Sequence, residues 1–193
     1  TRVGKQIHVM AGQSNLKRAW TELGGKSPNI VFADCPNLDK AVESAVGSIF
    51  FNQGESCNAP SRLFVEASIK DAFLEKALAL VPGYAPANPT LPGTVMGAVV
   101  DKVQMKTVLG YIESGKAEGA QLIAGGEQAL SETGGCYVQP TIFDGVTPQM
   151  KIAREEIFGP VLSVLSFTDA ADVVRMANDS VYGLQAGVWT RDI

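Results

Sequence analysis

Three short polar stretches hold the side chains of this sequence that could do chemistry. Cys57 lies in the first, FFNQGESCNAPSR, where an apolar run stops and the chain turns. A thiol on such a turn, close to exposed backbone amides, can have its thiolate stabilised by the N–H groups. The same amides can hold the oxyanion that forms when a thiolate attacks a carbonyl carbon. Cys57 is therefore a candidate nucleophile, although an arbitrary cysteine is more often a buried structural residue.

The other two cysteines are interpreted as structural residues. Cys35 lies in a polar turn before Pro36, and Cys136 follows two glycines with no acid–base partner in its motif. Three widely spaced cysteines outside C-x-x-C pairs argue against a disulfide framework, which favours a reduced, cytoplasmic protein. Because His8 is the single histidine of the sequence, we expect no metal site.

Glu22, in TELGGKSPN, is the candidate general base. We predict a strand over residues 17–23, which places Glu22 at a strand end beside Gly24 and Gly25. A carboxylate beside a flexible turn can enter and leave a site, as a base used in only one step must do. The competing interpretation is an ordinary exposed glutamate. The GGKS letters do not form a phosphate-binding loop, because the first glycine is not at the required distance from Lys26.

The third stretch is REEIFGPVLSV, at residues 154–164. Here Glu156 and Phe158 precede a Gly-Pro turn and the most apolar strand that we predict. A carboxylate can accept hydrogen bonds from ribose hydroxyls, and an aromatic ring can pack on a flat ring, so this pair suits a dinucleotide. The alternative is a charged helix end that stops at Gly159 and Pro160.

The elements that must position these residues alternate between helices and strands. Helices are predicted over residues 2–13, 38–51, 69–80, 100–118 and 170–178, with Ser68 as the N-cap of the third. Strands are predicted over residues 17–23, 28–33, 61–66, 120–124, 137–143, 161–168 and 185–190. The proline-containing segment 82–98 is expected to be an ordered surface loop of the same domain. This order predicts an α/β fold: an open, twisted, mostly parallel sheet with helices on both faces.

Composition narrows the classes of partner. The chain has 193 residues, 46% of them hydrophobic, which is enough for one sizeable core. Its 16 basic and 20 acidic side chains give a net charge of -4, and no basic stripe is present to bind nucleic acid or a membrane surface. No apolar run reaches the roughly 20 residues that span a bilayer. We therefore expect neither nucleic acid nor a membrane surface as a partner.

ELGGKSPN, FFNQGESC and EEIFGPV, in this order, resemble the aldehyde dehydrogenase superfamily. The resemblance extends over essentially the whole chain, through MG at 96–97, PTIF at 140–143 and NDSVYGL at 178–184. The segments VFADCP (31–36), FFNQGE (50–55) and VWTRD (188–192) are most similar to bacterial enzymes of the γ-glutamylaminobutyraldehyde type. The resemblance implies a homodimer or homotetramer for the parent protein.

The resemblance also implies roles for four residues. Cys57 would attack the aldehyde carbon to give a thiohemiacetal, and hydride would pass to the nicotinamide of NAD or NADP. Glu22 would then activate the water that hydrolyses the resulting thioester. Glu156 would hold the nicotinamide-ribose hydroxyls, and Phe158 would pack nearby. One departure is Glu55, where the family more often has Gln; we expect its side chain to point to solvent.

The resemblance divides the chain into two parts and implies a domain truncated at both ends. Residues 1–20 would be the end of a cofactor-domain helix and its connector, and residues 21–193 a catalytic domain incomplete at its C-terminus. NAD or NADP would then bind poorly without the absent cofactor domain. Two alternatives stand beside this interpretation. An acylating, CoA-dependent relative is disfavoured because it typically lacks the glutamate found here at position 22, and a non-catalytic binding or assembly module has no need of Cys57, Glu22 and Glu156 together.

Overall fold

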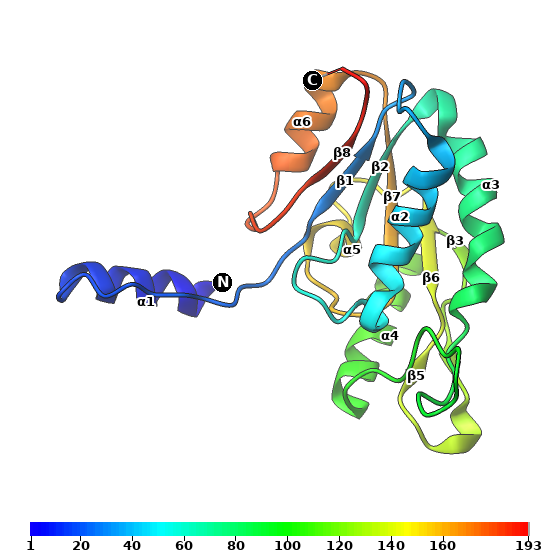
Figure 1. Ribbon diagram of the computed structural model, residues 1–193, viewed down its shortest axis with the longest axis horizontal. Coiled ribbons are helices and arrows are strands. Elements are labelled where there is room, and N and C mark those ends of the chain that lie inside the picture. The colour runs from blue at the N-terminus through cyan, green and yellow to red at the C-terminus, as the bar shows by residue number, and fades with distance from the viewer. Residues whose placement is uncertain (193) are drawn as a thin grey trace.

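The computed structural model, which describes residues 1–192, is built on a six-stranded sheet (Figure 1). The strands lie in the order β3-β6-β7-β2-β1-β8. Every neighbouring pair is parallel except β3 and β6, which are antiparallel. The predicted mostly parallel sheet is therefore confirmed. The strands are β1 Pro28–Val31, β2 Arg62–Glu66, β3 Gln121–Ala124, β6 Thr141–Asp144, β7 Val161–Phe167 and β8 Gly187–Trp189, and β4 Gln128–Ala129 pairs separately with β5 Tyr137–Val138.

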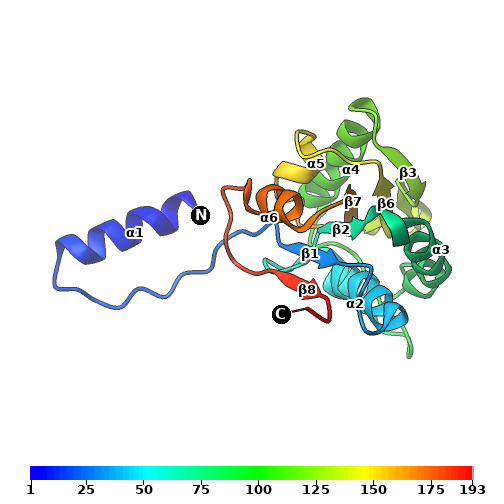
Figure 2. The same cartoon turned by 90° about the horizontal axis from the view of Figure 1, so that it is seen from above.

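Helices cover both faces of this sheet, as predicted. Seen from above, α2 and α3 lie on one face, and α4, α5 and α6 lie on the other (Figure 2). The α-helices are α1 Arg2–Gln13, α2 Leu38–Phe50, α3 Lys70–Leu80, α4 Lys102–Ala117, α5 Lys151–Arg154 and α6 Ala170–Asn178. Short 3₁₀ turns are η1 Phe51–Gly54, η2 Ala67–Ile69, η3 Val81–Tyr84 and η4 Ser131–Thr133.

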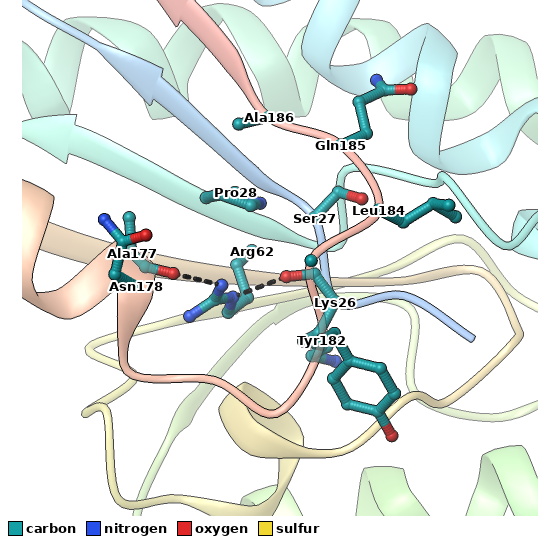
Figure 3. A pocket seen from close by; sticks show the side chains of 11 residues that line it. Lys26, Ser27, Pro28, Arg62, Ala177, Asn178, Tyr182, Leu184, Gln185 and Ala186 are labelled. Atoms are coloured by element: carbon teal, nitrogen blue, oxygen red, sulfur yellow. Dashed lines mark hydrogen bonds between the residues drawn. The ribbon is translucent and has the colours of Figure 1, made fainter. Parts of the chain in front are cut away.

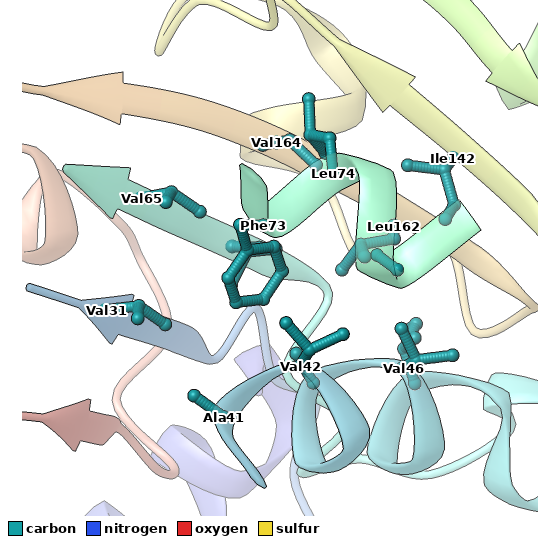
Figure 4. Packing of buried hydrophobic residues seen from close by; sticks show 14 of the residues in the cluster. Val31, Ala41, Val42, Val46, Val65, Phe73, Leu74, Ile142, Leu162 and Val164 are labelled. Atoms are coloured by element: carbon teal, nitrogen blue, oxygen red, sulfur yellow. The ribbon is translucent and has the colours of Figure 1, made fainter. Parts of the chain in front are cut away.

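Two apolar clusters, one on each face, hold the layers together. Successive residues of a strand point to opposite faces, so β7 supplies Leu162 and Val164 to one cluster and Val161 and Leu165 to the other. Figure 4 shows the first cluster, where Val42 and Val46 of α2 and Phe73 and Leu74 of α3 meet the sheet. The second cluster gathers Val108, Ile112, Ile152, Val173 and Met176 of α4, α5 and α6 against Ile30, Phe64 and Phe143.

Polar N-caps fix where three of the helices begin. Asn37, Asp101 and Asp169 each accept a hydrogen bond from the backbone N–H three residues later, at 2.9, 2.7 and 2.8 Å. Such a bond satisfies one of the N–H groups that a helix start leaves without a partner. The predicted Ser68 cap is wrong. The turn η2 precedes α3, and the Ser68 hydroxyl donates to Glu66 Oε1 at 3.3 Å instead.

The predicted strand over residues 17–23 is also wrong. This segment is extended but has no strand pairing, and it joins α1 to the body of the domain (Figures 1 and 2). Trp20 is 89% exposed there, because no neighbouring strand lies alongside to bury the apolar side chains that suggested a strand. Within α1 only Gly4 is buried. By contrast, the loop predicted at 82–98 does lie in the domain, with Met96 fully buried.

Candidate functional site

One pocket of about 570 Å³ brings the four predicted site residues together. We call it the thiol pocket; its walls are formed by Glu22, Leu23, Gly24, Glu55, Ser56, Cys57, Glu156 and Phe158. Three segments contribute, and each directly precedes one of the strands β1, β2 and β7. These strands are parallel neighbours, so the segments before them meet at the same, amino edge of the sheet.

Two glycines allow the first segment to lie against the other two. The Gly25 N–H donates a hydrogen bond to Glu156 Oε1 at 3.1 Å. A Cβ atom at Gly24 would overlap Glu156 Oε2, and one at Gly25 would overlap the carbonyl oxygen of Cys57. The Gly-Gly pair is thus required for close approach, while Glu22 just before it is exposed on the pocket wall. We predicted Glu22 at a strand end; it lies in the extended segment before β1.

A left-handed turn brings Cys57 into the pocket. At the end of α2, three consecutive residues have positive φ: Asn52 at 48°, Gln53 at 57° and Gly54 at 71°. The two non-glycine residues are strained in this region, because Cβ crowds the following carbonyl. A Cβ at Gly54 would also overlap the Gly159 carbonyl, so this turn packs against the Glu156–Phe158 segment. Cys57 is half-buried as a result.

Phe158 is held by a residue that sequence reasoning missed. Its φ is 55°, left-handed for an aromatic residue, and its ring is 39% exposed at the pocket. The side chain of Gln104 in α4 donates through Nε2 to the carbonyls of Ile157 at 3.0 Å and Phe158 at 2.7 Å. These bonds stabilise a conformation that is rare for a bulky side chain. No motif in the sequence singled out Gln104, because its role depends on a contact 54 residues along the chain.

The two adjacent glutamates of this segment have different surroundings. Glu155 accepts a hydrogen bond from the Tyr111 hydroxyl at 2.7 Å, away from the thiol pocket. Burial, and then this bond, raise the pKa of Tyr111 to about 12. Glu156 lines the thiol pocket and is half-buried. The structure therefore presents Glu156, the second of the two glutamates, at the pocket.

Glu55 corrects one expectation. We expected its side chain to point to solvent, but it is only partly exposed and lines the thiol pocket. Its Oε1 atom accepts a hydrogen bond from the Val100 N–H at 3.0 Å. Glu55 therefore lines the same pocket as the candidate nucleophile, and its carboxylate is fixed by a backbone group.

Behind the two glycines lies a buried ammonium group. Lys26 is 1% exposed, and its Nζ atom has no hydrogen-bond partner among residues 1–192. Burial is the main reason that the pKa of Lys26 falls to about 7, and the nearby Arg62 guanidinium lowers it too. Figure 3 shows this second pocket, of about 330 Å³, where Arg62 donates to the carbonyls of Lys26 at 2.9 Å and Ala177 at 2.8 Å.

The two remaining cysteines lie outside the thiol pocket. Cys35 packs partly against the first apolar cluster, and burial raises the pKa of its thiol. Cys136 is half-buried, and its carbonyl accepts a hydrogen bond from the Val99 N–H at 2.9 Å. Within the part of the chain that the structure describes, no group of three or more His, Cys, Asp or Glu side chains could hold a metal ion. Among the same residues, no helix is long and apolar enough to cross a membrane.

Fold and pocket together define an α/β domain that presents one thiol beside three carboxylates and an exposed aromatic ring. The model of the aldehyde dehydrogenase family matches residues 1–193. The chain belongs to the aldehyde dehydrogenase family.

Individual relatives agree with the family match. The chain is 51% identical to the mouse (Mus musculus) protein "Aldehyde dehydrogenase, cytosolic 1". The match covers 100% of this chain and 38% of the mouse protein. A solved γ-glutamyl-γ-aminobutyraldehyde dehydrogenase from Burkholderia cenocepacia is 57% identical, with a TM-score of 0.92 over 100% of this chain and 38% of that one. A solved indole-3-acetaldehyde dehydrogenase of P. syringae, in complex with NAD+, is 56% identical, with a TM-score of 0.93. The match covers 100% of this chain and 39% of that chain. The chain thus spans about two fifths of the length of these relatives.

Proposed function

We propose that this chain is the catalytic part of an NAD(P)-dependent aldehyde dehydrogenase that oxidises an aldehyde to a carboxylic acid. The observation that supports this most directly is the thiol pocket. It gathers Cys57, Glu22 and Glu156 from three segments that are far apart in the sequence. A thiol, a base and a group that can hold a sugar are what oxidation through a covalent thioester requires.

The first step belongs to Cys57. Its thiolate attacks the aldehyde carbon and forms a C–S bond, while the carbonyl electron pair moves to oxygen. The covalent bond holds the substrate carbon in one place, which replaces a bimolecular encounter by a positioned one. Backbone N–H groups of the turn around Cys57 are suited to hold the oxyanion.

Glu156 and Phe158 are the candidates for holding the cofactor. One Glu156 oxygen is fixed by the Gly25 N–H, and the other lies against Gly24, where a Cβ atom would overlap it. A ribose hydroxyl could donate to this second oxygen. The exposed Phe158 ring offers a flat surface beside it. These residues fit a nicotinamide nucleotide, which when bound would accept the hydride from the substrate carbon.

Glu22 acts in the last step. Its carboxylate takes a proton from water, the water oxygen attacks the thioester carbon, and the C–S bond breaks to release the Cys57 thiolate and the acid. Glu22 is exposed and lies in a segment without strand pairing, which suits a base that is needed only after hydride transfer.

The aldehyde's own side chain would lie on the other side of the Cys57 turn. Ser56 and Asn58, which flank Cys57, line a separate pocket of about 530 Å³ together with Phe51 and Glu43. Two relatives named for different aldehydes are almost equally similar to this chain, at 57% and 56% identity. Overall similarity therefore does not identify the aldehyde, and we propose that the residues of this pocket contribute to the choice of substrate.

Alkylation of the three cysteines tests the assignment of the nucleophile. At pH 7, below the ordinary thiol pKa of about 8.5, we expect iodoacetamide to modify Cys57 faster than Cys35 and Cys136. Propanal should slow the modification of Cys57 alone, because a thiohemiacetal blocks its sulfur. Peptide mass spectrometry measures all three rates in one sample. Equal rates and no protection would remove Cys57 from the role of nucleophile and leave a non-catalytic module as the better description.

A Glu22→Gln variant of the full-length protein tests the base. We expect a single turnover of NADH to survive, since hydride transfer precedes hydrolysis, while steady-state turnover falls by about 10²–10⁴-fold. Absorbance at 340 nm after rapid mixing separates the two phases. Glu66→Gln, at the far end of β2, serves as the control and should keep both phases. Loss of the first turnover together with the second would contradict the assigned order of steps.

A further inference from the structure

The Cys57 turn is tied to a part of the chain that carries none of the three motifs. We call residues 96–100 the anchor segment. Glu55 Oε1 accepts a hydrogen bond from the Val100 N–H at 3.0 Å. Gln53 Oε1 accepts one from the Gly97 N–H at 3.2 Å. Both acceptors, Gln53 and Glu55, belong to the turn that precedes Cys57, and both donors are backbone N–H groups of the anchor segment.

The anchor segment is itself firmly placed in the domain. Met96 and Val99 are buried, at 0% and 3% exposure. The Met96 carbonyl accepts a hydrogen bond from the Ala87 N–H at 3.1 Å, and the Val99 N–H donates to the Cys136 carbonyl at 2.9 Å. Buried side chains and satisfied backbone groups make this segment a fixed point against which the turn can be held.

The turn needs such support because its backbone is strained. Asn52 and Gln53 both have positive φ, which costs energy for residues with a Cβ atom. Within the turn, the Glu55 N–H donates to the Asn52 carbonyl at 2.9 Å, and Asn52 Nδ2 donates to the Glu55 carbonyl at 3.0 Å. The side chains of Gln53 and Glu55 link this strained unit to the anchor segment through the bonds described above.

Charge gives Glu55 a second effect. Three carboxylates line the thiol pocket, those of Glu22, Glu55 and Glu156, and none of its eight lining residues is Lys or Arg. Glu55 lies two positions before Cys57. Lys26, buried behind Gly24 and Gly25, interacts with Glu156, but no cation lines the pocket beside Glu22 and Glu55. We therefore expect a reactant with a negative charge to approach the sulfur less readily than a neutral or positive one.

We infer that Glu55 is a positioning residue for Cys57. Its carboxylate links the Cys57 turn to the anchor segment by a hydrogen bond, and its charge disfavours anionic reactants at the sulfur. This inference rests on the proposed function, in which Cys57 is the nucleophile. Substitution by Gln keeps an oxygen acceptor and removes the charge, whereas substitution by Ala removes both. The two variants therefore separate the positioning effect from the electrostatic one.

The test compares Glu55→Gln and Glu55→Ala with a matched control elsewhere in the domain. Glu66 makes the same kind of bond, with Oε2 accepting from the Ala33 N–H at 2.7 Å, but it lies at the opposite end of β2. Hydrogen exchange reports directly on the bond. We expect the Val100 amide to exchange about 2- to 10-fold faster in Glu55→Ala and to keep its rate in Glu55→Gln. Glu66→Ala should leave Val100 unchanged.

Cysteine chemistry reports on positioning and charge. With iodoacetamide, the rate of Cys57 relative to Cys136 should fall at least threefold in Glu55→Ala, roughly the loss of one hydrogen bond, and recover in Glu55→Gln. Methanethiosulfonate reagents of opposite charge, used at low salt, test the electrostatic effect. Glu55→Gln should raise the rate at which the anionic sulfonatoethyl reagent modifies Cys57, relative to the cationic trimethylammonioethyl reagent, by about two- to threefold. A merely structural residue would not change this charge ratio.

The outcomes separate the two proposals. If Val100 exchange, Cys57 reactivity and the charge ratio are the same in both variants as in the unmodified chain, the positioning role of Glu55 is overturned. If Glu66→Ala slows Cys57 as much as Glu55→Ala does, the effect is one of general stability, and the role is overturned as well. If Cys57 is not preferentially alkylated in the unmodified chain, the proposed function fails, while Val100 exchange still decides whether Glu55 holds the turn.

Discussion

Lys26 combines an ammonium group with almost no exposure, and this burial costs the domain stability. Its pKa is about 7 in the folded chain, against the ordinary lysine value of 10.5 that holds in the unfolded chain. Below pH 7 both states carry the proton, so the folded state bears the full cost of a buried charge. Between pH 7 and 10.5 the unfolded chain binds a proton that the folded chain does not, so stability rises with pH in this window.

Lys26→Met should therefore stabilise the domain, and more at low pH than at high pH. The expected gain is about 3–5 kcal/mol at pH 7 and below, because an apolar side chain of similar length removes the unpartnered charge. It should shrink by roughly 2–3 kcal/mol at pH 9. Urea unfolding at pH 7 and at pH 9 measures the gain in unfolding free energy. Lys106→Met, on the exposed side of α4, serves as the control. A gain that does not change with pH would show that the charge of Lys26 is not what the substitution relieves.

At the scale of the element, the turn η1 places a strict demand on residue type. Gly54 has a φ of 71°, and a Cβ there would overlap the Gly159 carbonyl. Gly54→Ala should destabilise the domain by about 2–4 kcal/mol, since strain and overlap add, and should slow the alkylation of Cys57. Gly110→Ala, where an added Cβ meets nothing in the middle of α4, should instead stabilise by about 0.5–1 kcal/mol.

Thermal unfolding followed by circular dichroism compares the two glycine variants. Opposite signs are the expected result. If Gly54→Ala is as stable as the unmodified chain, the turn must have an alternative conformation that places Cys57 equally well. That result would contradict the role assigned to its left-handed backbone.

Strong local patterns made most elements predictable from the sequence. The apolar spacing of residues 2–13 and 170–178 predicted α1 and α6, and the apolar run at 161–168 predicted β7. The strand expected at 17–23 failed because its apolar side chains indicated burial, while the structure places no strand beside them. The four-residue helix α5 and the two-residue strand β4 were not predicted, since elements so short have no periodicity to recognise.

The thiol pocket was predictable in its motifs but not in its supports. Cys57, Glu22, Glu156 and Phe158 were named from the sequence, and the structure brings them to one pocket. Their chemical roles remain predictions for the alkylation and turnover experiments to decide. The contacts of Gln104 with the Phe158 carbonyl and of Glu55 with the Val100 N–H were missed, because each joins residues about 50 positions apart through a backbone group. Backbone partners leave no signature in residue type.

For the whole molecule, α1 and the rest of the domain should behave independently. Among the residues of α1 only Gly4 is buried, and the connecting segment through Lys17 and Arg18 is exposed. Trypsin should cleave first after Lys17 or Arg18, because an unpaired extended segment fits a protease more readily than a packed helix. The remaining fragment should keep its melting temperature within about 2 °C, since little packing is lost.

Lys106 provides the internal control for this cleavage. It is also exposed but lies within α4, so it should resist trypsin while the segment that joins α1 to the domain is cut. Mass spectrometry identifies the sites, and a thermal scan of the product measures the transition. A drop of many degrees after cleavage would mean that α1 contributes to the core in a way its exposure does not show.

The parallel order of the sheet has a consequence for how the protein is made. β2 lies between β1, which precedes it, and β7, whose residues follow it by about a hundred positions. At the ribosome's pace of roughly 5–20 residues per second, Cys57 emerges several seconds before Glu156 and Phe158 exist to close its pocket. β8, which pairs with β1 through Asn29 and Gly187, arrives later still. During biosynthesis the thiol therefore spends its first seconds open to whatever oxidants and electrophiles the nascent chain meets.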